Sequence, residues 1–119
     1  MKYPAIASKT LTVSEAAVSA GAVAFGSRAA LASWVGIHRS QITRLARGQA
    51  VGGDQAWRLA SLAAVVTALL SFLDSSAIAG WMQGNNPHLN DRRPVDVLAA
   101  GDVAGVMAAV QASRTGGFA

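Results

Sequence analysis

Six polar residues whose side chains could bind a ligand lie close together in one short segment of the sequence. They are Arg39, Ser40, Gln41, Thr43, Arg44 and Arg47. Arginine reads guanine edges or neutralises phosphate, and serine, threonine and glutamine hydrogen-bond to base edges or to the nucleic-acid backbone. If these residues lie on one face of a helix, they predict a DNA-contacting surface. Arg39, Ser40 and Arg44 are then expected to contact base edges, and the other three are expected to contact phosphates.

The flanking residues predict the elements that would position these side chains. A short helix over 28–35 ends at Gly36, and a second over 39–47 closes at Gly48. A glycine between the helices permits the positive φ that a tight turn needs, and His38 is expected as a cap or turn residue. The residues expected to face inward are Ala29, Leu31, Ala32, Val35, Ile37, Ile42, Leu45 and Ala46. This pattern predicts a helix-turn-helix.

Charge is concentrated in the same region. Residues 28–58 hold five arginines against one aspartate (+4), whereas residues 1–27 carry +1 and residues 59–119 carry −1. A basic block attracts polyanions by releasing their counterions, although a solvated helix face would look the same. One recognition helix binds weakly, so specific binding to operator DNA predicts a homodimer.

The composition favours an all-α fold, because alanine accounts for 26 residues and is the best helix former. A lead-in over 1–11 and loops over 48–54 and 84–94 are expected to separate the helices. The first helix is expected to begin at residue 12 or 14 and to end at 25. Further helices are expected over 28–35, 39–47 and 55–73, the last of them capped by Asp54. A short helix ending near 83, a helix from 94 that is stopped by Gly101, and a helix over 103–113 follow. Residues 1–58 would form the helix-turn-helix region and 59–119 a second region, sharing the helix 55–73.

The apolar run over 59–73 has two interpretations. It is shorter than the ~20 residues of a membrane span, so we expect a buried central helix; a small membrane-associated protein is the alternative. Lys9 and Glu15 interrupt the N-terminal apolar stretch, so we expect no signal peptide and a cytoplasmic protein.

No set of residues has the spacing of an active site. The two histidines, His38 and His88, are isolated, cysteine is absent, and the glycine-rich segment 48–53 lacks a phosphate-binding lysine. Asp91, Asp96 and Asp102 have the spacing of loop and cap residues. The expectation is a protein that is not an enzyme and has no cofactor or metal.

The second region carries an ordered pattern of aromatic, polar, proline and glycine positions. Its members are Trp81, Asn85 or Asn86, Leu89, Pro94, Val97, Leu98, Gly101, Val106, Val110, Gly117 and Phe118. This order resembles the toxin-binding domain of the Xre/MbcA/ParS-type antitoxins, in which a helix-turn-helix part precedes that domain. The resemblance covers most of the chain.

The resemblance implies a partner, a RES-domain toxin that destroys NAD, bound in a hetero-oligomeric complex. Members of this family cover the toxin's active-site cleft with the C-terminal segment reaching in, and repress their own operon. The residues expected to contact the toxin are Trp81, Asn85, Asn86, Arg92, Arg93, Arg114, Gly116, Gly117, Phe118 and Ala119.

Each of these assignments has a structural alternative. Trp81 could be core, Arg92 and Arg93 a solvated loop, and the tail a frayed end. For the tail we hypothesise that Phe118 anchors in an apolar pocket and that the carboxylate of Ala119 mimics a phosphate. For the whole chain, the alternative function is a helix-turn-helix transcriptional regulator without a toxin partner.

Overall fold

The computed structural model describes residues 11–51 and 53–116. These residues form seven α-helices, one two-stranded sheet and a 3₁₀ turn, so the fold is all-α as the composition predicts. In chain order the elements are β1 (Leu11–Ser14), α1 (Glu15–Phe25), α2 (Arg28–Val35), α3 (Arg39–Ala46), β2 (Arg47–Val51), α4 (Gly53–Leu70), α5 (Ser75–Gln83), the 3₁₀ turn Pro87–Leu89, α6 (Pro94–Ala99) and α7 (Val103–Arg114).

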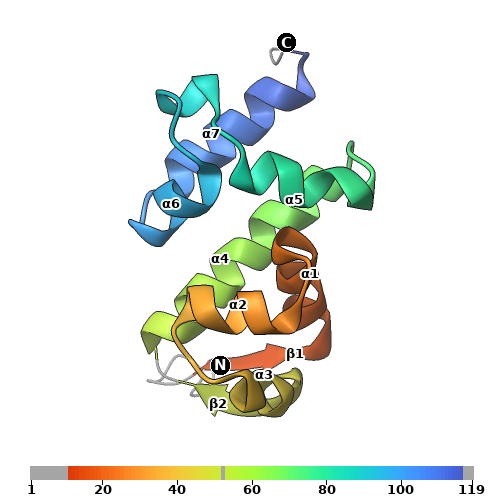
Figure 1. The fold of residues 1–119 in the computed structure, drawn as a ribbon, viewed down its shortest axis with the longest axis vertical. Coiled ribbons are helices and arrows are strands. Elements are labelled where there is room, and N and C mark those ends of the chain that lie inside the picture. The colour runs from red at the N-terminus through yellow and green to blue at the C-terminus, as the bar shows by residue number, and fades with distance from the viewer. Residues whose placement is uncertain (1–10, 52, 117–119) are drawn as a thin grey trace, which may run out of the picture.

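The long helix α4 lies in the middle of the molecule, with α1–α3 and the sheet on one side of it and α5–α7 on the other (Figure 1). Its buried side chains recur every three or four residues and are Ala56, Leu59, Leu62, Val65, Val66 and Leu69. This spacing gives a wide apolar stripe, which is why helices from both ends of the chain pack against α4.

The helix-turn-helix predicted from the sequence is present. α2 spans the predicted residues, its N-terminus is capped by Ser27 Oγ, which accepts from Ala30 N at 3.1 Å, and it ends at Gly36 with φ 92°. α3 then packs against α1 and α2. The positive φ of Gly36 turns the chain sharply enough to lay α3 across α2.

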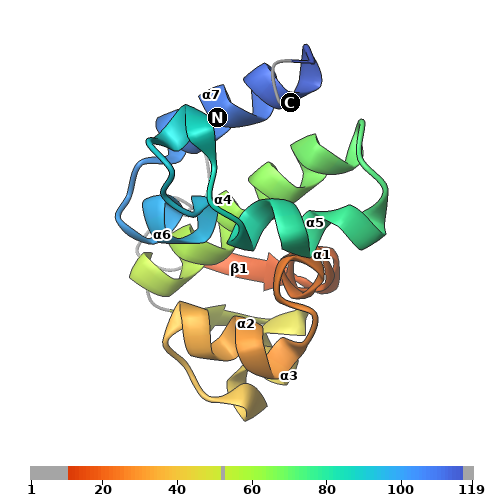
Figure 2. The same ribbon diagram turned by 45° about the horizontal axis from the view of Figure 1, so that its top comes forward.

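A small antiparallel sheet lies beside α3 (Figure 2). β1 covers the end of the expected lead-in and the expected start of the first helix, and β2 covers Arg47 and the first four residues of the expected loop over 48–54. Leu11 pairs with Val51 and Thr12 with Ala50. The loop prediction over 48–54 is wrong because strand pairing joins segments almost forty residues apart, and nothing local in a short sequence such as RGQAV shows that a partner strand exists.

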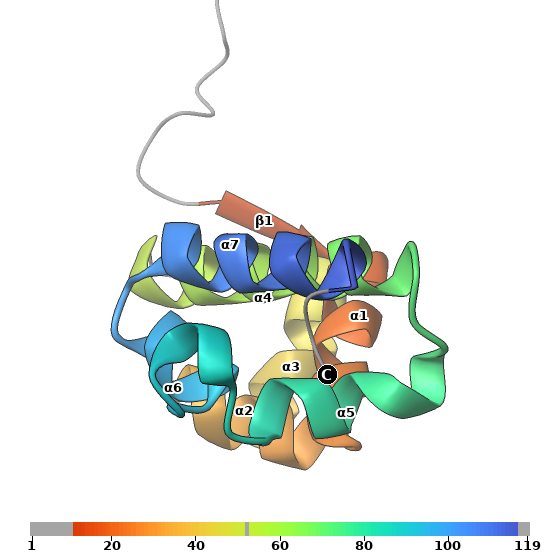
Figure 3. The ribbon, with the colours of Figure 1, turned by 90° about the horizontal axis from the view of Figure 1, so that it is seen from above.

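The C-terminal helices form the other end of the molecule, and α7 runs alongside α4 (Figure 3). Local capping explains where they begin. Asp74 accepts from Ser76 N at 3.2 Å before α5, Pro94 occupies the first turn of α6, and Asp102 accepts from Gly105 N at 2.9 Å before α7. The roles of Pro94 and Asp102 confirm the sequence prediction.

Three details of the predicted helices are corrected. α4 begins at Gly53 and ends at Leu70, not over 55–73, so Asp54 lies inside the first turn instead of capping it. There its charge still faces the positive helix end favourably. Ala29, expected to face inward, is exposed, because the buried side of α2 is set by Leu31, Ala32 and Val35, and Ala29 lies about a third of a turn away from it.

One hydrophobic core serves both ends of the molecule. Val18, Leu31 and Ile42 belong to the same buried cluster as Met82 and Val106. The division into regions 1–58 and 59–119 therefore stays a prediction about function. No single helix of the described residues is long and apolar enough to cross a membrane; one pair bent by 95°, α1 with α2, passes by length and composition only.

Candidate functional site

Five of the six predicted DNA-contacting residues lie on the outward side of α3, and the sixth, Arg47, follows as its C-cap residue and the first residue of β2. All six of them, from Arg39 to Arg47, are exposed, whereas Ile42 and Leu45 are buried at 0% and 3% exposure. The inward residues sit three apart and lock α3 against the core. The amphipathic pattern thus fixes which way the polar side chains point.

The six side chains differ in whether they form hydrogen bonds within the molecule. Gln41 folds back on its own helix, its Oε1 accepting a hydrogen bond from His38 N at 2.8 Å, and His38 is the N-cap residue as predicted. Within the described part of the chain, the guanidinium groups of Arg39, Arg44 and Arg47 make no hydrogen bond or ion pair. Three exposed cations on one surface are available for an anionic ligand.

The other two arginines of the basic block are used internally. Arg28 forms an ion pair with Glu15. Arg58 donates to Trp34 O at 2.9 Å and lies 5.6 Å from the centroid of the Trp34 ring. The block therefore divides into three exposed cations, two on α3 and one at its C-cap, and two cations that hold helices together.

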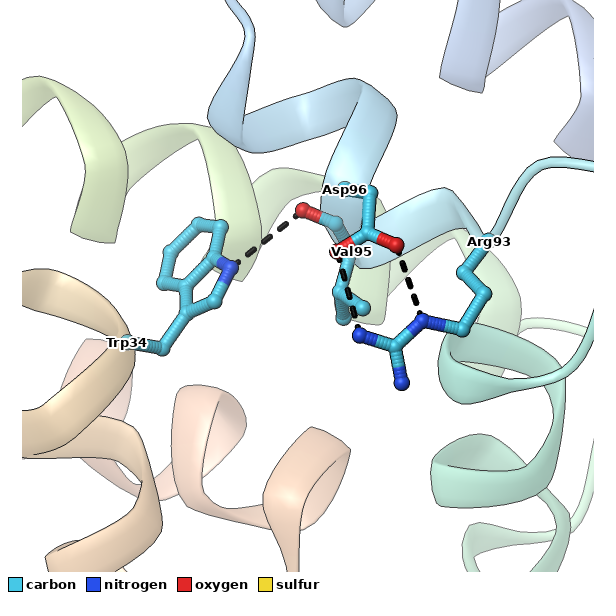
Figure 4. A network of polar contacts seen from close by, with 4 residues as sticks. All are labelled: Trp34, Arg93, Val95 and Asp96. Carbon is cyan, nitrogen blue, oxygen red and sulfur yellow. Dashed lines mark hydrogen bonds and ion pairs between the residues drawn. The ribbon is translucent and has the colours of Figure 1, made fainter.

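Trp34 is half-buried and joins the two ends of the molecule. Its ring lies 5.5 Å from that of Phe25, and its Nε1 donates to Val95 O of α6 at 3.2 Å (Figure 4). The bond ties the helix-turn-helix to α6, because an indole N–H in a partly buried site needs an acceptor.

Figure 4 also shows Arg93, one of the predicted toxin-contacting residues, paired with Asp96 on the first turn of α6. The two N–H···O distances are 2.9 and 3.1 Å. The hydrogen bond from Arg93 lowers the pKa of the Asp96 carboxyl, and the same bond raises the pKa of Arg93. Both side chains are exposed, so the pair adds little stability but orients Arg93.

Asn86, also predicted to contact a toxin, is only 6% exposed and organises the loop before α6. Its Oδ1 accepts from His88 N at 2.8 Å, and its backbone pairs with that of Arg92. Arg92 in turn donates from Nε to Leu89 O at 3.1 Å. Asn85, by contrast, is exposed. A buried amide bonded in this way shapes the loop and leaves surface contact to its neighbours.

Trp81 and Arg114 are also engaged within the molecule. Trp81 is half-buried and donates from Nε1 to the buried Ser113 Oγ at 3.1 Å. Arg114 donates to Ser71 Oγ at 2.7 Å and lies 5.2 Å from the centroid of the Phe72 ring. Sequence reasoning missed Ser113, whose only signal is a hydroxyl on the apolar stripe of α7.

The predicted toxin-contacting residues do not form one cluster. Asn85 to Arg93 lie on the loop that leads into α6, whereas Trp81 and Arg114 link α5 and α4 to α7. Gly116 follows α7 with φ 87°. Gly117, Phe118 and Ala119 lie outside the described residues.

Neither a surface groove nor a metal site gives a second strong candidate among the described residues. An open groove of about 450 Å³ lies between α1 and the start of α5, and its only charged lining residue is the ion-paired Arg28. No group of three His, Asp or Glu among the described residues could hold a metal ion.

Comparison with known proteins gives one informative likeness. No family model and no curated protein match the chain. A solved structure does match: a chain of the crystal structure of the M. tuberculosis MbcT–MbcA toxin–antitoxin complex, with a TM-score of 0.70 and 26% sequence identity over 88% of this chain and 96% of that one. Through almost its whole length, the chain resembles an antitoxin of the MbcA type.

Proposed function

We propose that this chain is the antitoxin of a type II toxin–antitoxin pair, neutralising its toxin by direct binding. The observation that carries this proposal is the likeness to the toxin–antitoxin complex over 88% of the chain. A likeness that includes α5–α7 as well as the helix-turn-helix supports more than DNA binding, because a helix-turn-helix alone would account for only the first part.

The toxin we propose is a RES-domain protein that degrades NAD. The order of residues from Trp81 through Val110 supports this class, since it resembles the toxin-binding domain of antitoxins against such toxins. The exposed polar residues before α6, Asn85, Arg92 and Arg93, would contact the toxin's surface. Their neighbour Asn86 would hold the loop in shape.

Inhibition would come from the C-terminal residues, which follow the end of α7. The chain turns at Gly116, whose φ is 87°. We propose that Gly117 to Ala119 enter the toxin's cleft, with Phe118 in an apolar pocket and the terminal carboxylate on cations that otherwise bind NAD phosphates. The antitoxin itself performs no chemistry and acts by occupying the site.

The test is co-expression with a RES-domain toxin. We expect the two chains to co-purify in a fixed ratio and cellular NAD to stay normal. Deleting residues 116–119 should restore NAD loss while leaving the antitoxin's unfolding transition unchanged. The Arg39→Ala/Arg44→Ala variant is the matched control, because it should still protect NAD. Full protection by the truncated chain would exclude tail occlusion.

We also propose that α3 of a homodimer binds operator DNA and represses the operon, in the cytoplasm. The exposed guanidinium groups of Arg39, Arg44 and Arg47 support this, because they have no hydrogen bond or ion pair with the residues that the structure describes. The same observation favours the second candidate, a regulator without a toxin partner. The two differ in one result: only the antitoxin forms a stoichiometric complex with a RES-domain toxin.

A further inference from the structure

The end of α7 and the turn that follows α4 lie side by side (Figure 3). Arg114, in the last turn of α7, donates to Ser71 Oγ at 2.7 Å, and its guanidinium lies 5.2 Å from the centroid of the Phe72 ring. Leu70 is the last residue of α4 and directly precedes Ser71. We call these four residues the tail-base surface, because the C-terminal tail begins two residues after Arg114.

Two groups of the tail-base surface are available to a partner. Leu70 is 42% exposed, and among the other large apolar side chains of the described residues only Trp57, at 40%, is comparably open to solvent. Arg114 is also exposed, and its hydrogen bond to Ser71 uses one of the five N–H groups of the guanidinium. Because the internal contacts already orient this guanidinium, a partner that binds it costs less side-chain entropy.

This chemistry indicates what the partner must offer. An exposed leucine beside an oriented guanidinium fits a surface on which an apolar side chain lies next to a carboxylate.

The proposed insertion of the tail limits how far the toxin can lie from the tail-base surface. Ala119 is three residues after Gly116. An extended chain spans at most about 3.6 Å per residue, so the Cα atom of Ala119 lies within about 11 Å of that of Gly116 in any conformation. A cleft that takes Phe118 and Ala119 must therefore bring its rim against the end of α7, beside Arg114.

We propose that the tail-base surface is a second toxin contact, which packs against the rim of the cleft while the tail enters it. Leu70 packs on an apolar part of the rim, and Arg114 binds a carboxylate there. This inference rests on the proposed antitoxin function and divides the work of inhibition. The tail-base surface supplies affinity, whereas the tail supplies occlusion of the active site.

The experiment is titration calorimetry of the full chain and its variants against a RES-domain toxin. Leu70→Gln should weaken the affinity about tenfold or more, because the apolar contact with the rim is lost. Trp57→Gln is the matched control and should leave the affinity unchanged. Trp57 has nearly the same exposure as Leu70 but lies about 20 Å away along α4. Urea unfolding checks that both variants keep the stability of the parent.

Substitutions of Arg114 test the charge. Arg114→Gln should weaken the affinity and also reduce the dependence of toxin binding on salt, because an ion pair across the interface is screened by ions. Loss of the internal contacts with Ser71 and Phe72 alone would not change that salt dependence. Arg114→Lys keeps the charge and should keep the salt dependence.

Removal of residues 116–119 separates the tail-base surface from the tail. The shortened chain should still bind the toxin without protecting NAD, and Leu70→Gln should weaken the binding that remains. An unchanged affinity of Leu70→Gln overturns the proposal, and so does an equal loss in Trp57→Gln. If Leu70→Gln and removal of residues 117–119 destabilise the free chain equally, the tail of the same chain covers Leu70 and the proposal is wrong.

The same titrations keep this inference apart from the proposed function. A parent chain that binds no RES-domain toxin excludes the antitoxin function itself. Tight binding that depends on residues 116–119, but not on Leu70 or Arg114, excludes only the tail-base contact.

Discussion

The outward side of α3 and the polar residues around α5–α7 were both predicted as binding surfaces, yet their side chains are in opposite states. The guanidinium groups of Arg39, Arg44 and Arg47 make no described internal contact. Trp81 and Arg114 bond to distant residues of the chain, and Asn86 and Arg93 bond to residues two and three positions away. Substituting one of these three arginines is expected to weaken ligand binding without changing stability, whereas substituting a residue of the second set is expected to change stability as well.

The largest effect is expected on α3. Arg39→Ala/Arg44→Ala should weaken operator binding about a hundredfold and reduce the slope of log affinity against log salt by about 2, because two cations no longer release counterions. Fluorescence anisotropy over a salt series measures both. Arg93→Gln removes a cation that already has an internal partner and should change neither. An equal loss of DNA affinity in both variants would show that the two regions do not differ in this way.

The next effect separates two adjacent asparagines. Asn86→Ala should lower the free energy of unfolding by about 1–2 kcal/mol, because His88 N loses its acceptor and the loop loses its cap. Asn85→Ala, at an exposed position, should stay within about 0.5 kcal/mol of the parent. Urea unfolding of both variants measures the difference. If Asn85→Ala were the more damaging, the loop's organisation would be misassigned.

A smaller effect concerns the bond between α5 and α7. The cycle of Trp81→Phe, Ser113→Ala and the double variant should give a coupling energy of about 1 kcal/mol, since the indole N–H and the hydroxyl bond to each other in a partly buried place. Thermal unfolding of the four proteins measures it. Additive losses would mean that each side chain acts through packing only.

The smallest effect is the pH dependence of the Arg93–Asp96 pair. The folded-state pKa of Asp96 lies below its unfolded value, so the pair contributes stability above the unfolded pKa and loses it as the pH falls through the folded pKa. Arg93→Gln should raise the pKa of Asp96 toward its ordinary value, as NMR titration of the carboxyl carbon would show. An unchanged titration would mean that Arg93 does not hold the carboxylate in solution.

Local signals predicted most of the helices. Gly36, Pro94 and Asp102 fix their turns and helix starts through backbone freedom, a preset φ and a side-chain cap, and each acts within a few residues. The β1–β2 pairing and the internal bonds of Trp34, Trp81 and Arg114 were not predicted. Each joins residues at least thirty positions apart, and no local pattern encodes such a distance.

The sequence by itself determined that the chain is helical, that α2 and α3 form a helix-turn-helix, and that the polar residues of α3 point outward. The spacing of the apolar residues determines these features, because the side of a helix opposite its buried stripe must face solvent. Only the tertiary structure decided which polar residues are already bonded. Hydrogen-bond partners such as Ser113 for Trp81 come together only after the helices have packed, and residue type does not reveal whether a side chain is still available to a ligand.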